Sequence, residues 1–218
     1  MINLNPYKEY FPQAYTKYDD DPYSDIHSLV QKLPTNKSAI DLLESSDAQK
    51  ILKLIRSLIF IKNYKSTIPF PEKFEDAIRL IVKIKNTRPK KPISKSSKAL
   101  LKELLDTEGF QLPTASAVFH FCHPEHYPIV DTNVETAIGS IFENCHNELA
   151  EKSAPNLPST EDSLIKKIEI YQDFMTILSQ ITKCHNEQYE TEYSFRDLDK
   201  ALMVLGNKKH KEKAESTA

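Results

Sequence analysis

The amino-acid sequence predicts an all-α protein, and three observations support this fold class. Apolar residues recur at spacings of three and four along most of the 218-residue chain, and prolines interrupt these repeats. No segment sustains the alternation of apolar and polar residues that is typical of a strand. The chain has only three glycines, where average usage of about 7% would give roughly fifteen. So few glycines leave little room for tight turns and hairpins.

The first third of the chain predicts an irregular arm followed by helices. Residues 1–24 hold five tyrosines, three prolines and an acidic run at 19–21, which indicates an arm that packs by its aromatic rings. From Ser24 to Pro34 the apolar residues have helical spacing. Ser46 and Asp47 then cap a helix whose broad apolar face indicates burial. Another amphipathic helix follows Pro71.

The stretch from Lys83 to Lys98 is basic, with seven lysines or arginines, two prolines and no acidic residue, and it predicts a loop or linker. This loop either is simply solvated or contacts a nucleic-acid backbone through Arg88, Lys90, Lys91 and Lys95. Helices are then predicted over about 96–106, 113–123, 131–150, 162–184 and 194–205. Residues 151–160 predict a loop. The predicted organisation is the arm 1–24, one helical domain 25–206, and a charged flexible tail 207–218.

Composition excludes several classes of function. The three glycines are isolated, so neither of the glycine-rich nucleotide-binding loops can be written. A formal net charge of -2 gives no global electrostatic reason to bind nucleic acid, so any such contact must be local. No run approaches the length of a membrane span, and no signal peptide is visible. The three cysteines form no C-x-x-C pair, which favours reduced thiols and a cytoplasmic protein, with the nucleoid or nucleus as its place of work left open.

The most informative segment is 104–139, LLDTEGFQLPTASAVFHFCHPEHYPIVDTNVETAIG. Gly109 allows a turn after one helix, and Pro113 suits the first turn of the next. Pro124 and Pro128 end that second helix and keep the following connection extended. Asp131 stands just before a third helix, where an acidic side chain caps the N-terminus. The segment therefore predicts helix, turn, helix, extended connection, helix.

This segment resembles the core of the helix-hairpin-helix (HhH-GPD) DNA glycosylase superfamily, which includes endonuclease III-like and adenine-mismatch glycosylases. Gly109 matches the first glycine of the family's L-P-G-V-G hairpin, and Thr114-Ala115 matches the T-A that follows it. Residues 130–134 match the V-D-T-N-V motif, whose aspartate is catalytic in the family; here it is Asp131. The spacing between these pieces needs no gap.

The resemblance implies a two-lobed helical fold with Asp131 at the cleft between the lobes. It also implies that the hairpin, with Gly109, Phe110, Gln111 and Thr114, contacts double-stranded DNA through its backbone, independently of base sequence. A carboxylate near the sugar stabilises the positive charge that develops when an N-glycosidic bond breaks, or activates water. The base must first leave the stack. Tyr127, His123 and Asn133 are candidates for the lining of the cleft.

Three departures from the family pattern narrow the expected chemistry. Gln111 replaces the second hairpin glycine, which changes the approach to phosphate. Pro113 occupies the position of the Schiff-base lysine of bifunctional members, so covalent lyase chemistry is excluded there. Only Cys145 and Cys184 follow the aspartate motif, so we expect no iron–sulfur cluster and no other cofactor.

Structural roles remain open for several of these residues. Asp131 is either a helix cap alone or a cap and a catalyst, Gly109 is a helix stop or part of a phosphate-binding hairpin, and Tyr127 lines the cleft or packs in the core. His120, Cys122, His123 and His126 do not make a convincing metal set, because Pro124 breaks the helix between them. We therefore expect no metal.

Three functions follow from this sequence. The leading hypothesis is a monofunctional DNA N-glycosylase that acts in base excision repair. The second is a non-catalytic helix-hairpin-helix module that binds DNA. The third is a helical interaction protein that has lost DNA binding, which the acidic arm and the near-neutral charge favour. Neither the base that is recognised nor the oligomeric state can be predicted.

Overall fold

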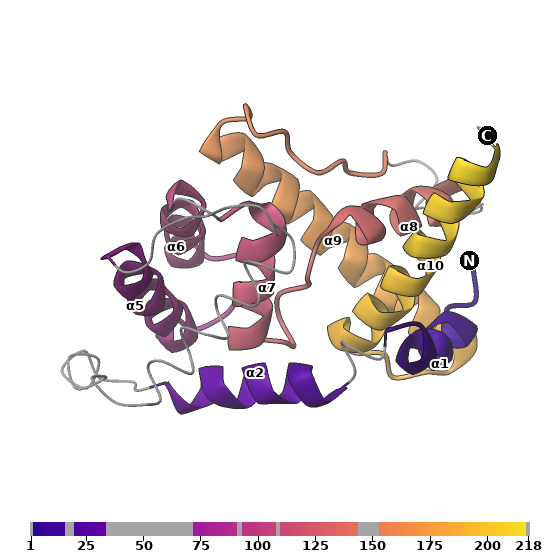
Figure 1. Cartoon of the computed structure of the whole chain (residues 1–218), viewed down its shortest axis with the longest axis horizontal. Coiled ribbons are helices and arrows are strands. Elements are labelled where there is room, and N and C mark those ends of the chain that lie inside the picture. Colours follow the sequence, from indigo (N-terminus) through magenta and orange to yellow (C-terminus); the bar gives the residue numbers. More distant parts are fainter. Residues whose placement is uncertain are drawn as a thin grey trace.

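The computed structural model describes residues 2–15, 20–33, 72–90, 93–107, 110–143 and 153–216. Every regular element in these ranges is an α-helix, which confirms the predicted all-α class for this part of the chain (Figure 1). The helices are α1 (Asn5–Ala14), α2 (Asp20–Lys32), α5 (Glu72–Asn86), α6 (Lys95–Asp106), α7 (Leu112–Cys122), α8 (Thr132–Glu143), α9 (Leu164–Tyr189) and α10 (Phe195–Ser216). The helix predicted near residues 46–59 lies outside the described ranges.

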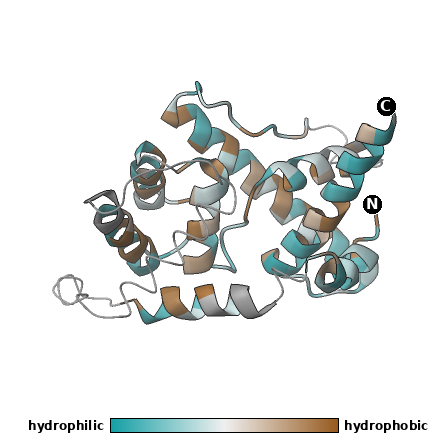
Figure 2. Cartoon of the chain, in the orientation of Figure 1, coloured by the Kyte–Doolittle hydropathy of each residue, from teal (hydrophilic) through white to brown (hydrophobic). Residues whose placement is uncertain are grey.

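The helices pack in two groups that share one hydrophobic core. In the first group α5, α6 and α7 contact one another, and α2 packs against α5 and α7. In the second group α1 and α8 both pack on α10, and α9 contacts both α6 and α10 (Figure 1). Seven of these helices, α2 and α5 to α10, contribute buried side chains to one continuous apolar cluster, which also includes Leu4 just before α1; the last turns of α10 contribute none. The last turns of α10 are mostly hydrophilic (Figure 2).

The prediction of an irregular arm over 1–24 is wrong, because α1 and the first turn of α2 occupy it. Pro6 lies in the first turn of α1, where its missing N–H leaves no hydrogen bond unmade. Phe11 of α1 is 1% exposed, so burial against α10 stabilises a helix that its prolines and tyrosines alone do not predict. The backbone N–H of Leu4, just before α1, donates to Nε2 of His185 at 3.2 Å and fixes the start of the helix.

Two boundaries also differ from the prediction. The basic loop predicted from Lys83 begins later, since α5 continues to Asn86 and α6 starts at Lys95. The helix predicted to end near residue 205 continues to Ser216, so residues 207–216 of the predicted tail are helical. Lysine and glutamate are good helix formers, and Glu212 pairs with Lys209 at 2.8 Å, which supports the extra turns.

Candidate functional site

The predicted hairpin region joins α6 to α7 by a short turn. The cap of α6 is Ser94, whose Oγ accepts a hydrogen bond from the Ser97 N–H at 3.1 Å. After the helix ends at Thr107, the Phe110 N–H donates to the Thr107 carbonyl at 3.1 Å and turns the chain towards α7. The predicted hairpin residues differ in exposure: Phe110 (3% exposed) and Thr114 (7%) are buried, Gln111 is exposed, and Gly109 lies outside the described ranges.

The N-terminal end of α7 is the feature of the turn that suits an anion. Gln111 is the N-cap residue, and its side chain makes no capping hydrogen bond. Pro113 in the first turn contributes no N–H. A helix N-terminus without a side-chain cap presents backbone N–H groups and the positive end of the helix dipole. A phosphate oxygen is the kind of acceptor that such an end binds.

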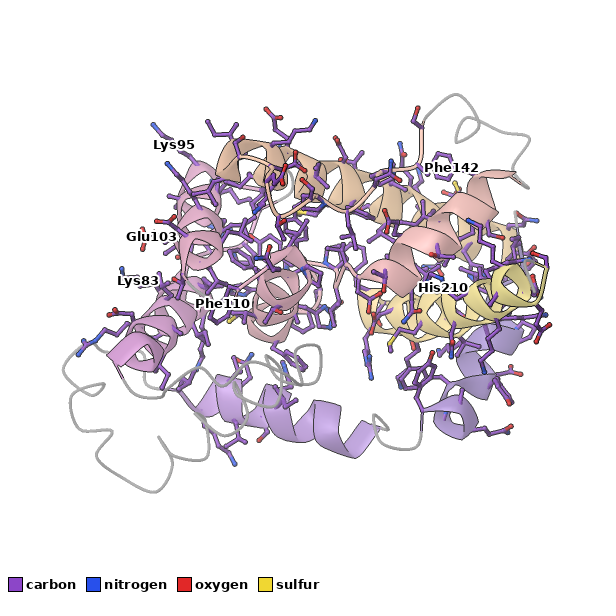
Figure 3. The ribbon with its side chains drawn as sticks, turned by 45° about the horizontal axis from the view of Figure 1, so that its top comes forward. Lys83, Lys95, Glu103, Phe110, Phe142 and His210 are labelled. Carbon is purple, nitrogen blue, oxygen red and sulfur yellow. The ribbon has the colours of Figure 1, made fainter. Side chains whose placement is uncertain are left out.

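The basic stretch before α6 divides into structural and exposed residues. Lys83 pairs with Glu103 at 3.5 Å and so links α5 to α6, while Lys85 donates to the backbone carbonyls of Gln31 and Leu33. The other members, Arg88, Lys90 and Lys95, are exposed, and Lys91 lies outside the described ranges. Lys83, Glu103 and Lys95 lie along one outer edge of α5 and α6 (Figure 3). The exposed cations therefore lead directly into the helix that precedes the turn.

The connection from α7 to α8 is held by two side chains that the sequence did not single out. Ser116 of α7 accepts a hydrogen bond at its Oγ from the Val130 N–H at 3.1 Å. Tyr171 of α9 donates from its hydroxyl to the Pro128 carbonyl at 3.1 Å. Both Ser116 and Tyr171 are fully buried. Ser116 could have been noticed in the sequence, because it is a polar residue within the otherwise apolar run 115–119. Nothing in the sequence around Tyr171 indicated its contact with Pro128.

Asp131 follows this connection and caps α8. Its Oδ1 accepts hydrogen bonds from the N–H groups of Asn133 at 2.9 Å and Val134 at 3.0 Å. Its carbonyl accepts from the Glu135 N–H at 2.9 Å. The residue is only 7% exposed. The capping role is therefore present in the structure, and the catalytic role stays a hypothesis.

Gly206 of α10 lies against the backbone of the first turn of α8. A Cβ at this position would lie 2.1 Å from the carbonyl oxygen of Asn133 and 2.7 Å from its Cα, so only glycine allows the two helices to approach this closely. Residue 206 is thus inside α10, where the sequence placed the end of the helix. The contact places α10 directly against Asn133, two residues after Asp131. Asn133 itself is half-buried.

The histidines and Tyr127 are used for packing. His120 is fully buried, and its Nδ1 lies 2.8 Å from the Tyr127 carbonyl; because a carbonyl only accepts, Nδ1 carries the proton. Burial lowers the pKa of His120 to about 4, so the imidazole is neutral. His123 lies at the end of α7 with Nε2 2.9 Å from the Ile84 carbonyl.

Tyr127 belongs to the core rather than to an open surface. It is 1% exposed, its hydroxyl donates to Ser97 Oγ at 3.1 Å, and its ring meets Phe119 edge to face. Cys122 is also buried, which raises the pKa of its thiol to about 12. Across the part of the chain that the structure describes, no cluster of histidine, cysteine, aspartate or glutamate side chains is arranged to hold a metal ion.

Comparison with protein-family models, with curated proteins and with solved structures finds no match for this chain. The function must therefore be inferred from the residues themselves. Among the described helices, none combines the length and apolar character needed to cross a membrane.

Proposed function

We propose that this protein binds double-stranded DNA through the turn between α6 and α7 and hydrolyses the N-glycosidic bond of a damaged or mismatched base. The observation that carries the proposal is the order of these parts. Two helices joined by a short turn are followed by an extended connection and by Asp131 at the cap of α8. This order agrees with the glycosylase-like segment that the sequence predicts at residues 104–139.

Binding in this proposal uses the backbone of the DNA. The first turn of α7 supplies N–H groups for a phosphate, and Arg88, Lys90 and Lys95, which are exposed between the end of α5 and the start of α6, supply positive charge. Contacts to phosphate position a protein on duplex DNA without reading its sequence. Binding that does not depend on base sequence suits an enzyme that must examine many positions along the DNA.

Catalysis in this proposal uses the carboxylate of Asp131. Loss of the base leaves positive charge on the sugar, which a fixed carboxylate stabilises while water attacks the sugar carbon. Since Pro113 replaces the lysine of the bifunctional enzymes, we expect hydrolysis alone, without cleavage of the DNA strand.

The burial of Asp131 favours a second candidate function. At 7% exposure, and with Oδ1 already accepting two hydrogen bonds, Asp131 serves the fold whether or not it serves catalysis. A helix-hairpin-helix module that binds DNA and has no catalytic activity needs Asp131 only as a helix cap. The two candidates share the DNA-binding surface and differ only at Asp131.

A base-release assay distinguishes them. Duplexes that each carry one damaged or mismatched base are incubated with the wild type, with Asp131→Asn and with Asp162→Asn, a carboxylate change in the loop before α9. Asparagine caps a helix as well as aspartate does, so Asp131→Asn removes the charge and keeps the fold. We expect at least one duplex to lose its base with the wild type and with Asp162→Asn, and about 100-fold more slowly with Asp131→Asn.

Equal rates for the wild type and Asp131→Asn would contradict the catalytic role of Asp131. If the wild type binds every duplex and releases no base, the second candidate replaces the first. Urea unfolding of Asp131→Asn and Asp131→Ala checks the fold: we expect the alanine variant to lose about 1 kcal/mol, and the asparagine variant much less.

A further inference from the structure

A groove of about 960 Å³ lies between α1 and the last turns of α10. Its α1 wall is fixed in place, because the Tyr15 hydroxyl donates to the Met203 carbonyl at 3.2 Å and Lys8 pairs with Asp197 at 2.7 Å. Tyrosines of α1 and of its C-cap, together with charged residues of α10, line the groove: Tyr7, Tyr10, Tyr15, Lys208, Lys211 and Glu212. The DNA-binding residues proposed above are not part of it.

The α10 wall of the groove is a single stripe of charge. The stripe has four residues at spacings of three, one and three, which places them on one face of the helix: Lys208, Lys211, Glu212 and Glu215. At 100° per residue, this face is opposite to Gly206, which contacts α8. The stripe is well exposed, with the Lys208 side chain at 60% and the Glu212 side chain at 47%. It therefore faces away from the core.

The order of charges along this stripe is self-complementary. Two lysines are followed by two glutamates, so the stripe read backwards has the opposite signs. When two α10 helices lie antiparallel about a two-fold axis between Lys211 and Glu212, Lys208 of each copy faces Glu215 of the other. Lys211 likewise faces Glu212. A parallel arrangement in the same register would instead place like charges opposite one another. The pattern thus selects one orientation.

Tyr10 supplies the apolar part of this surface. Its side chain is 53% exposed, and only one other large hydrophobic residue in the described ranges, Ile165, is clearly exposed. Tyrosine is enriched at protein interfaces, because its ring buries apolar area and its hydroxyl keeps a polar contact. Lys208 Nζ already lies 6.0 Å from the centre of the Tyr7 ring. An α10 helix of a second copy would cover these rings.

We infer that the groove between α1 and α10 is an interface for a second copy of this chain, which forms a two-fold symmetric dimer with antiparallel α10 helices. The charge order of the stripe, in which Lys208 and Glu212 also pair within one helix at 4.0 Å, favours the antiparallel orientation, and the exposed tyrosine of α1 supplies contact area. The interface leaves the α6–α7 turn outside it, so each copy of the dimer retains its own turn.

Sedimentation equilibrium of the full chain tests this dimer with two charge-swapped variants. One variant carries Lys208→Glu and Lys211→Glu, and the other carries Glu212→Lys and Glu215→Lys. We expect the wild type to dimerise at micromolar concentration, and each variant alone to dimerise at least about tenfold more weakly because like charges meet. An equimolar mixture of the two variants should dimerise again, since an acidic stripe then faces a basic one.

The recovery in the mixture separates a lost interface from a lost helix, because variants that had unfolded could not restore one another. Lys213→Glu changes the charge of α10 off the stripe and should dimerise like the wild type. Tyr10→Ala should weaken the dimer and leave thermal unfolding of the monomer unchanged. A wild type that stays monomeric throughout the micromolar range would overturn the inference, and so would charge-swapped variants that dimerise as the wild type does.

Discussion

At the scale of single residues, three side chains that suggested chemistry serve the fold. Asp131 caps α8, His123 contacts the Ile84 carbonyl, and Tyr127 donates to Ser97. The sequence left both roles open for Asp131 and Tyr127, because residue type does not reveal burial. For Tyr127 the structure decides in favour of the core. For Asp131 the cap is observed, and catalysis is a separate property that only the base-release assay measures.

His120 gives the protein a predictable loss of stability in acid. Burial lowers its folded pKa to about 4, whereas an unfolded histidine has a pKa of about 6.5. Between these values the unfolded chain binds a proton that the folded chain does not. The stabilisation is therefore complete above pH 6.5 and is lost as the pH falls towards 4. We expect His120 alone to lower the free energy of unfolding by about 2 kcal/mol between pH 7 and pH 5.

Urea unfolding of the wild type and of His120→Gln at both pH values measures this contribution. Glutamine is a neutral hydrogen-bond donor that can still reach the Tyr127 carbonyl. The variant therefore removes the titrating imidazole and keeps a hydrogen bond to that carbonyl. The loss between pH 7 and pH 5 should be smaller by about 2 kcal/mol in the variant. Burial also lowers the pKa of His185, which remains in both proteins. Identical losses would show that His120 does not titrate as its burial requires.

At the scale of elements, helices with local sequence signals were predicted well and helices that depend on distant contacts were not. The prediction of 96–106 agrees with α6, and 113–123 agrees with α7, because serine caps, prolines and apolar spacing mark their ends. The arm 1–24 was predicted as irregular, and its helix α1 is stabilised by burial against α10. The end of α10 was placed at Gly206, which instead marks a close approach of two helices.

Substitution of Gly206 tests the contact between α8 and α10. The Cβ of an alanine would overlap the backbone of Asn133, with 2.1 Å to its carbonyl oxygen, so the helices must separate. We expect Gly206→Ala to lower the free energy of unfolding by about 1–3 kcal/mol or more, as overpacking does elsewhere. Urea denaturation measures this value.

Gly139 of α8 is the matched control. Among the described residues, a Cβ at this position would meet nothing within 4 Å, and alanine is the better helix former. Gly139→Ala should therefore raise stability by about 0.5–1 kcal/mol. If both alanine variants were neutral or stabilising, the close approach at Gly206 would be absent from the protein in solution.

At the scale of the whole molecule, the candidate site is local in sequence but is held by distant segments. The turn, the connection and Asp131 lie within residues 107–131, so one short segment was enough to predict their order. Tyr171 of α9 and Gly206 of α10 fix that segment from 40 or more residues away, and no local pattern indicates such contacts. The continuous core across both groups of helices is the reason these segments meet.

We propose that the exposed cations before and at the start of α6, together with the α6–α7 turn, bind the backbone of DNA, and the salt dependence of binding measures this directly. Fluorescence anisotropy of a labelled duplex is followed from about 50 to 200 mM salt for three proteins. These are the wild type, Lys90→Ala with Lys95→Ala, and the control Lys166→Ala with Lys183→Ala, which removes two exposed lysines of α9.

We expect the wild type and the α9 control to bind DNA with the same steep loss of affinity as salt rises. The variant of Lys90 and Lys95 should bind more weakly, with a slope of log K against log salt that is shallower by about 2, one for each lost phosphate contact. Absence of binding at about 50 mM salt, or an unchanged slope in that variant, would show that Lys90 and Lys95 do not bind the DNA backbone.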